Sequence, residues 1–278
     1  MRPGLGGDLL SLPERTGRGK TGVRRRATCH PAKETQARGL CSSCYHLLWR
    51  RSKGVKGRPG GKVSVVENFF DTIDNFEKAY VLGFILADGH VNVAGNMWSI
   101  TNVDKNAIDY LHSLVGGRVY LTKKSKNSHK QAYQLAVCRK RQALQLEALG
   151  LKNDKSYTAA WPKVSPELEP DLLRGYLDGD GYLSKTLQRV SAVSASKLLM
   201  MGFAEAVGRI VGRVPKVTPV KTSIGKLGVN FVVMLTQQDE VRTLLGKVYT
   251  SGWGAKTKRA LEMVSRPRGK SGPKQEAL

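Results

Sequence analysis

The sequence has few acidic side chains and no long apolar segment. Its 278 residues include 22 Asp and Glu against 46 Lys and Arg, which gives a net charge of +24. It has no run of eighteen apolar residues and no long basic amphipathic helix, so neither a membrane-spanning nor a membrane-surface protein is expected. The N-terminus also lacks the apolar core of a secretion signal. We therefore expect an intracellular protein, in the cytoplasm or nucleoid of a prokaryotic or phage-infected host, with an organelle as the alternative.

The basic charge is unevenly distributed. Residues 1–66 contain 15 Lys and Arg against 3 Asp and Glu, residues 67–255 contain 24 against 17, and residues 256–278 contain 7 against 2. Half of the excess therefore precedes the main body of the chain. Nucleic acid is the partner that best matches such a charge.

One unit occurs twice in the sequence. YVLGFILADGH at residues 80–90 recurs as LLRGYLDGDGY at residues 172–182, with an offset of 92 residues. Each copy reads as a helix with two small residues four positions apart, and such residues lie on one helix face. A face of this kind lets two helix backbones approach closely, so we expect the two copies to pack side by side. The packing residues are Gly83, Ala87, Gly175 and Gly179.

Each copy ends with Asp-Gly. We expect the glycine to adopt the left-handed conformation that commonly ends a helix. The preceding residues, Asp88 and Asp180, would then lie at helix C-termini, where backbone carbonyls carry partial negative charge. Two carboxylates brought together there repel each other, and a hard divalent cation with oxygen ligands would relieve that repulsion. The alternative is that both dipeptides only end helices, but this does not explain the recurrence.

VLGFILADG and LRGYLDGDG resemble the paired motifs of the LAGLIDADG homing endonucleases in their single-chain form. The resemblance covers roughly residues 68–262, and Leu86 departs from it because the first motif Asp is missing there. It implies a site-specific nuclease that makes a staggered break in double-stranded DNA. It implies Mg²⁺ bound by the carboxylates of Asp88 and Asp180 and the carbonyls of Ala87 and Gly179. The basic residues that it places near the two active sites are Lys152, Lys155, Lys256 and Lys258.

The fold class expected is α+β. Alternating patterns after each motif predict two pseudo-symmetric αββαββα units, at residues 67–155 and 171–262, joined by a proline-rich linker at 156–170. In the first unit we expect a short helix near 69–76 and Asn102 as a helix cap. In the second we expect strands near 182–187, 189–194, 215–222 and 229–235, and helices at 197–211 and 238–245. Cys138 is expected to be a buried strand residue.

Two such units would form a saddle whose open sheet face lies in the DNA major groove, where strand residues read base edges. The basic residues on or beside these strands are the candidate DNA contacts. They are Arg118, Lys123, Lys124, Arg139, Lys185, Arg189, Lys216, Lys221 and Lys226. We expect a monomer on double-stranded DNA, with intron RNA as a further candidate partner.

The N-terminal part predicts a small metal module. Residues 1–26 read as a disordered basic arm, 27–51 as a zinc module, 52–66 as a basic linker, and 263–278 as a basic tail. The Cys41-x-x-Cys44 spacing is typical of a zinc knuckle, and the stretch resembles small treble-clef-like modules of mobile-element endonucleases. We expect Zn²⁺ bound by Cys29, His30, Cys41 and Cys44, with His46 as the alternative to His30.

Other functions remain as alternatives at this point. A nuclease-inactive DNA-binding regulator or an RNA maturase would use the same fold without requiring both acids. A splicing intein is disfavoured because the chain neither begins with Cys or Ser nor ends with His-Asn.

Overall fold

The computed structural model describes most of the chain after residue 62 and parts of the segment before it. The described residues are 27, 28, 30, 32, 35–37, 40–42, 44, 45, 63–122, 131–152, 155–184, 186, 188–222, 228–250 and 252–265. The arm at 1–26, most of the linker at 52–66 and the end of the tail lie outside them. The chain divides into two compact units, Met1–Gly61 and Lys62–Leu278.

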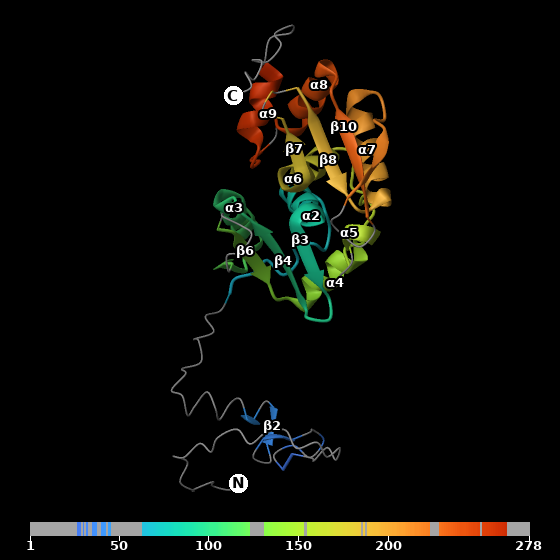
Figure 1. The fold of residues 1–278 in the computed structure, drawn as a ribbon. Helices are drawn as coiled ribbons and strands as arrows, with labels where there is room; N and C mark the ends of the chain where they lie inside the picture. The colour runs from blue at the N-terminus through green and yellow to red at the C-terminus, as the bar shows by residue number, and fades with distance from the viewer. Residues whose placement is uncertain are drawn as a thin grey trace, which may run out of the picture. The chain divides into compact units, whose positions relative to one another are not determined.

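The larger unit contains two halves with the same order of elements, shown from cyan to red in Figure 1. The first half consists of α2 (Phe76–Asp88), β3 (Gly89–Asn92), β4 (Met97–Asn102), α3 (Lys105–Val115), β5 (Arg118–Leu121), β6 (Tyr133–Val137) and α4 (Lys140–Ala148). The second consists of α6 (Glu169–Asp180), β7 (Gly181–Leu183), β8 (Val190–Ser194), α7 (Lys197–Val211), β9 (Val217–Lys221), β10 (Val229–Leu235) and α8 (Gln238–Val248). Two further helices, α5 (Lys155–Thr158) and α9 (Thr257–Ser265), follow the first and second halves. The α+β fold class is therefore confirmed.

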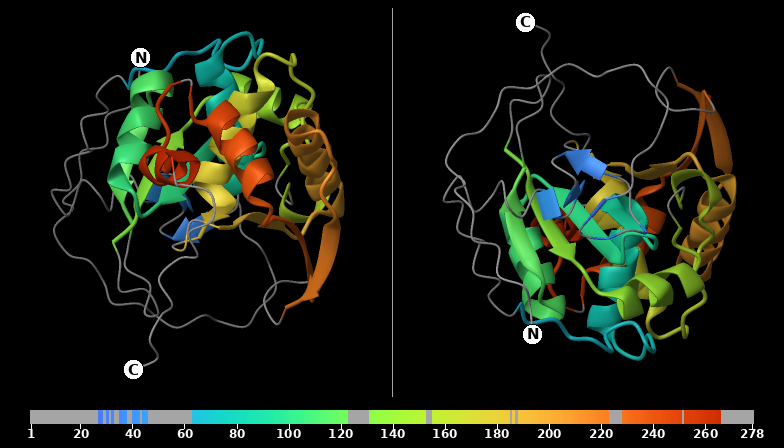
Figure 2. Two further views of the ribbon diagram at one scale, coloured as in Figure 1. Left: turned by 90° about the horizontal axis from the view of Figure 1, so that it is seen from above. Right: turned by 90° about the horizontal axis from the view of Figure 1, so that it is seen from below.

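Each half forms its own antiparallel four-stranded sheet. The strand orders are β3-β4-β6-β5 and β7-β8-β10-β9, which are the same arrangement repeated. The green part of the first half and the orange part of the second lie on opposite sides of the motif helices (Figure 2). In β8 and β10 the exposure alternates, with Val190, Ala192 and Val233 buried but Val193 and Met234 exposed. One face of this sheet therefore covers the core, and the other is open.

Strand β9 forms an outer edge of the second sheet. It pairs only with β10 among the described strands, and Pro219 stands opposite Phe231 in that ladder. Proline has no backbone N–H, so it is tolerated at an edge and not between two strands. The strand is also exposed along most of its length.

The pairing of the motif helices is the centre of the core. A Cβ added to Gly83 would lie 2.1 Å from the Leu172 carbonyl oxygen, and one added to Gly175 would lie 2.0 Å from the Tyr80 carbonyl oxygen. Each glycine therefore faces the backbone of the other helix, at a separation that excludes any side chain. The two motif helices therefore lie in direct backbone contact at these glycines.

The ends of the motif helices differ from the prediction. Gly89 and Gly181 have φ of −78° and −75° with extended ψ, so neither is left-handed. The reason is that each helix passes directly into a strand, β3 or β7, without the reversal that a left-handed residue makes. Glycine is required there by space, because a Cβ on Gly89 would lie 2.5 Å from the Ile85 carbonyl oxygen.

Three local expectations about the first half were wrong. Residues 67–70 form turns and no helix, and α2 begins at Phe76 after the cap residue Asn75. The cap of α3 is Asp104 and not Asn102. The segment assigned to the end of the linker is also structured, since Val65 bridges to Gly116 and the Gly117 N–H donates to the Ser64 carbonyl. Residues 63–66 therefore belong to the larger unit.

Boundaries in the second half also differ from those predicted. Strand β7 ends at Leu183, β9 begins at Val217, and α8 continues to Val248. The helix α9 was not predicted. Its sequence, TKRALEMVS, buries only Ala260 and Met263, so its apolar stripe is short.

The smaller unit contains a short antiparallel pair, β1 (Thr35–Ala37) and β2 (Leu40–Cys41). In the parts of the chain that the structure describes, no helix combines the length and apolar character needed to cross a lipid bilayer.

Candidate functional site

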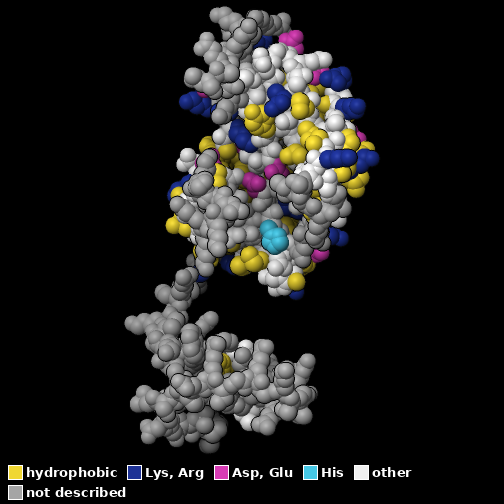
Figure 3. All heavy atoms as spheres, in the orientation of Figure 1, with side chains coloured by type: hydrophobic (Ala, Val, Ile, Leu, Met, Phe, Trp, Pro, Cys, Tyr) yellow, Lys and Arg dark blue, Asp and Glu magenta, His cyan; other side chains and the backbone are white. Residues whose placement is uncertain are grey.

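Two carboxylates lie at the adjoining ends of the paired motif helices. Asp88 is the last residue of α2 and Asp180 is the last residue of α6. A Cβ built on Gly179 of α6 would lie 3.5 Å from Asp88 Oδ2 and 2.3 Å from the Ala87 Cβ. The small residues at these positions therefore let the two helix ends meet. In Figure 3 acidic side chains lie together near the centre of the larger unit, with basic side chains around them.

The surroundings of both carboxylates disfavour negative charge. Burial raises the pKa of Asp88, and a hydrogen bond from Asn102 and the positive charges of Lys155 and Lys256 oppose this rise. Asp180 is exposed overall, yet the helix ends beside it displace part of its hydration. This desolvation, together with the charge of Asp88, raises the pKa of Asp180 to about 6. The pair is thus arranged so that an added cation would stabilise it.

Two lysines reach the carbonyls at the ends of these helices. Lys155 Nζ donates to the Leu86 and Ala87 carbonyls at 2.7 and 2.9 Å, and Lys155 is 6% exposed. Burial lowers its pKa to about 8, against the opposing effect of Asp180 and Asp88. The Ala87 carbonyl, a predicted metal ligand, is therefore also a lysine acceptor.

Lys256 occupies the related place in the second half. Its Nζ donates to the Leu177 and Gly181 carbonyls at 2.6 and 2.5 Å. Burial lowers its pKa as well, while Asp178, Asp88 and Asp180 act to raise it. The two lysines thus bring positive charge to the carboxylates from both halves.

The other two lysines of the predicted set lie elsewhere. Lys152 and Lys258 are exposed, and neither has a hydrogen bond or ion pair to the carboxylates. Lys152 only contributes its backbone carbonyl, which accepts from the Lys155 N–H. Lys258 lies in the first turn of α9, beside a hollow discussed below.

Sequence reasoning missed the role of Asn102. Its Nδ2 donates to Asp88 Oδ2 at 2.7 Å, and its Oδ1 accepts from the Asp104 N–H at 2.8 Å. The second bond fixes the amide so that its N–H side faces the carboxylate. Ser194, 92 positions later, accepts from the Ser196 N–H in the same way but has no bond to Asp180. The two carboxylates therefore have different neighbours.

Asp178 was also missed. It is 4% exposed, and it accepts hydrogen bonds from the Tyr80 and Tyr249 hydroxyls at 2.9 and 2.8 Å. It also accepts from the backbone N–H groups of Ala255 and Lys256 at 2.6 and 3.1 Å. Asp178 therefore holds the segment that carries Lys256. The corresponding residue of the first half is Leu86, 92 positions earlier. This difference between the two motif copies was the only sign in the sequence that Asp178 has a role of its own.

The predicted DNA contacts fall into three groups. Lys123, Lys124, Lys185 and Lys226 lie outside the described residues. Arg118, Lys216 and Lys221 are exposed at strand ends, and the Arg189 guanidinium lies 5.3 Å from the centre of the Tyr182 ring.

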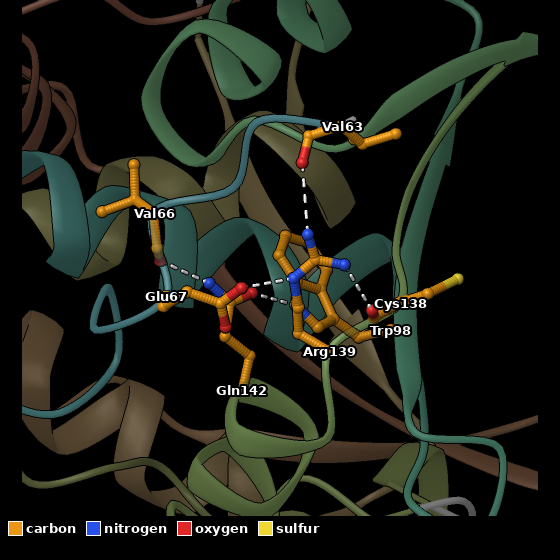
Figure 4. A network of polar contacts seen from close by, with 7 residues as sticks. All are labelled: Val63, Val66, Glu67, Trp98, Cys138, Arg139 and Gln142. Carbon is orange, nitrogen blue, oxygen red and sulfur yellow. Dashed lines mark hydrogen bonds and ion pairs between the residues drawn. The ribbon is translucent and has the colours of Figure 1, made fainter. Parts of the chain in front are cut away.

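Arg139 is different, because it already takes part in a network of polar contacts (Figure 4). It forms an ion pair with Glu67 and donates to the carbonyls of Val63 and Cys138. Beside it, Gln142 accepts from the Trp98 indole N–H at 2.8 Å and donates to the Val66 carbonyl at 2.7 Å. The network attaches residues 63–67 to α4. Cys138 is exposed just after β6 ends, so the expectation of a buried cysteine was wrong.

A second cluster lies in the smaller unit. His30 Nδ1 is 3.5 Å from both Cys41 Sγ and Cys44 Sγ, and all three ligand atoms lie within 4.8 Å of one another. Separations of this size fit ligands around one tetrahedral zinc ion. Cys29 and His46 lie outside the described residues.

Comparisons with known proteins found matches among solved structures only. No family model matches the chain, and no curated protein sequence matches it. Solved structures with a similar fold include full-length DUF199/WhiA from Thermatoga maritima, at 11% identity and a TM-score of 0.46, covering 72% of this chain and 64% of that one. They also include a mesophilic variant of the homing endonuclease I-DmoI, at 18% identity and a TM-score of 0.43, covering 64% of this chain and 97% of that one. The homing endonuclease I-WcaI bound to its DNA recognition sequence matches at 11% identity and a TM-score of 0.44, covering 70% of this chain and 92% of that one.

Proposed function

We propose that this chain is a site-specific, divalent-metal-dependent endonuclease of the LAGLIDADG type that makes a staggered break in double-stranded DNA. The observation that carries the proposal is the meeting of Asp88 and Asp180 at the ends of two packed helices, between the two four-stranded sheets of a strongly basic protein. A binding protein needs the basic sheets. It has no need of two carboxylates whose neighbours disfavour their charge.

The donor set fits Mg²⁺. Asp88 and Asp180 offer carboxylate oxygens and Ala87 and Gly179 offer carbonyl oxygens, and such hard ligands suit this ion. When bound, the metal supplies Lewis-acid stabilisation of phosphate charge and lowers the pKa of a water molecule. In phosphodiester hydrolysis the oxygen of a water molecule bonds to phosphorus and one P–O ester bond breaks. The water gives up a proton, and the departing oxygen takes one up.

The chain's own groups have distinct parts in this proposal. Lys155 and Lys256 hold ammonium groups beside the carboxylates, where they stabilise charge that develops on the phosphate. Asn102 orients the Asp88 carboxylate. Each half of the unit acts on one strand of the duplex.

DNA would lie along the open faces of the two sheets. Arg118, Arg189 and Lys216 are exposed on or beside these strands and can contact phosphates or base edges. Lys221 is also exposed, but its register in β9 places it on the same sheet face as the buried Val233. Lys123, Lys124, Lys185 and Lys226 remain candidates from the sequence. Arg139 is a weaker candidate because it already binds Glu67.

The decisive experiment is incubation of the purified protein with a randomised duplex library and Mg²⁺, followed by sequencing of the cut ends. We expect one long site with staggered ends. Selective binding without cutting would instead identify a nuclease-inactive DNA-binding protein. Selective binding of intron RNA in a parallel arm would favour a maturase.

The Asn102→Ser variant tests the unequal surroundings of the two acids. It gives the first half the serine that the second half has at Ser194, so Asp88 loses its amide donor. Loss of such a partner of a metal ligand typically costs about 10–100-fold in affinity or activity. We expect this loss for one strand only, measured as separate nicking rates for two end-labelled strands. Equal slowing of both strands would contradict the assignment, and Asn106→Ser on the surface of α3 is the control.

We also propose a structural Zn²⁺ site made by His30, Cys41 and Cys44, with Cys29 as the fourth ligand. A segment this short has little apolar surface, so metal ligation is the available source of folding free energy. The module would add phosphate contacts outside the catalytic centre.

Metal analysis of protein purified without chelators should find about one zinc per chain, since one structural site binds one ion. The Cys41→Ser/Cys44→Ser double variant should lose it, while Cys138→Ser, at an exposed cysteine of the larger unit, should keep it. Deletion of residues 1–61 should weaken DNA binding and reduce the slope of log K against log salt by about 0.9 per lost phosphate contact. Zinc-free full-length protein would remove this module from the proposal.

A further inference from the structure

A hollow of about 520 Å³ lies beside the second carboxylate. Strand β7, from Gly181 to Leu183, forms one wall, and Lys256 with the first turn of α9 forms the other. Gly181 directly follows Asp180, so the hollow begins where the candidate active site ends.

Cations predominate in the lining of the hollow. Lys256, Lys258 and Arg259 border it, and Glu262 is the one acid in its lining. Lys256 and Arg259 donate to backbone carbonyls of Gly181 and Leu183, which hold their side chains along the wall. Lys258 is exposed, and none of the ion pairs among the described residues includes it.

Two arginines elsewhere in the same half are each paired with a glutamate. Arg209 binds Glu169 and Arg213 binds Glu240, each through two hydrogen bonds. The hollow differs from these pairs, because its three cations outnumber its single acid and leave a net positive charge in the lining. The N-terminal end of α9 adds a partial positive charge in the same place.

The first half offers no matching group of cations. The residues two and three positions after Lys155 are Tyr157 and Thr158, where the second half has Lys258 and Arg259 after Lys256. The counterpart of Tyr182, 92 positions earlier, is His90. Lys258 and Arg259 therefore have no basic counterparts at these positions of the first half.

We infer that this hollow binds a backbone phosphate of the DNA, next to the phosphate that faces Asp180 on the same strand. The inference rests on the proposed function. A phosphodiester carries one negative charge and two free oxygens, which suit a lysine ammonium and an arginine guanidinium held side by side. One strand of the duplex is thereby held by a contact that the other strand lacks.

The test uses Lys258→Gln and the duplex selected from the library, with binding measured in Ca²⁺ over a range of salt concentrations. Loss of one phosphate contact should reduce the slope of log K against log salt by about 0.9. Lys258→Arg should keep the wild-type slope, and Lys197→Gln, an exposed lysine in the first turn of α7, should not change it. Circular dichroism should show that all variants are folded.

A second arm locates the phosphate. A single neutral methylphosphonate is placed in turn at each position near the cut of each strand. At one position on one strand, the methylphosphonate should weaken DNA binding by wild type. It should not weaken binding by Lys258→Gln, which has already lost this phosphate contact. Two results would show that the subsite does not exist, provided that wild type binds DNA. In one, Lys258→Gln has the wild-type salt slope. In the other, Lys258→Gln loses affinity at every methylphosphonate position where wild type does. If wild type binds no duplex, the proposed function itself is wrong.

Discussion

The Asp180→Asn variant should lose double-strand cleavage while its DNA binding persists and its thermal stability rises. Loss of a carboxylate ligand removes several kcal/mol of transition-state stabilisation, so we expect a fall of about 10³-fold or more in the cutting rate. Binding should change little, because Asp180 is not a phosphate contact. Asp88→Asn should behave in the same way. Cleavage of both strands at the wild-type rate in Mg²⁺ would show that these acids share no catalytic metal.

The stability change has a defined pH dependence. The pKa of Asp180 is raised from 3.8 to about 6 in the folded protein, so folding favours its protonated form. Ionisation of Asp180 therefore destabilises the folded protein. This destabilisation is absent below about pH 4 and complete above about pH 6. The melting temperature of Asp180→Asn, measured without divalent metal, should exceed that of wild type increasingly across this window. Asp109→Asn, at an exposed acid paired with Lys105 on α3, is the control and should show no such gain.

The Gly175→Ala variant should strongly destabilise the larger unit. Its added Cβ would lie 2.0 Å from the Tyr80 carbonyl oxygen, and backbone atoms of α2 cannot move aside as a flexible side chain can. Overpacking costs about 1–3 kcal/mol and occasionally more. We expect the upper end of this range, because the two helices must separate along their whole contact. For a unit of this size, about 3 kcal/mol corresponds to a fall of roughly 6–12 °C in Tm.

The matched control is Gly246→Ala in α8, where nothing lies within 4 Å of the added Cβ. Alanine is the better helix residue, so this change should leave Tm unchanged or raise it slightly. Gly83→Ala should resemble Gly175→Ala, since its Cβ would meet the Leu172 carbonyl oxygen at 2.1 Å. Equal Tm values for Gly175→Ala and Gly246→Ala would refute close backbone contact between the motif helices.

The repeat explains why so much of the fold could be predicted. Gly83 and Gly175 recur at the offset of 92 residues, and this spacing alone implies two similar units with paired helices. The closeness of Asp88 and Asp180 could then be predicted, because each aspartate directly precedes the glycine that ends its motif. Alternation and turn residues then gave the order of the strands.

What could not be predicted depends on contacts between distant segments. Asn102 bonds to Asp88 because β4 ends beside the end of α2, and a sequence shows neither end in space. Asp178 bonds to two tyrosines and to the segment before α9, which lies more than 70 residues away. The wrong conformation predicted for Gly89 also depends on the path of the chain in space. A left-handed glycine usually ends a helix where the chain reverses direction. Here α2 continues directly into β3.

The proline in β9 has a consequence for self-association. An exposed edge strand offers a row of backbone groups on which another chain can add a strand, and this is a common start of aggregation. Pro219 removes one N–H from the middle of that row, and Lys216 and Lys221 place positive charge at or beside its two ends. A second copy approaching this edge would meet like charges and a gap in the ladder. Pro219→Val should therefore leave the fold intact but promote aggregation of concentrated protein at high salt, where the repulsion between lysines is screened.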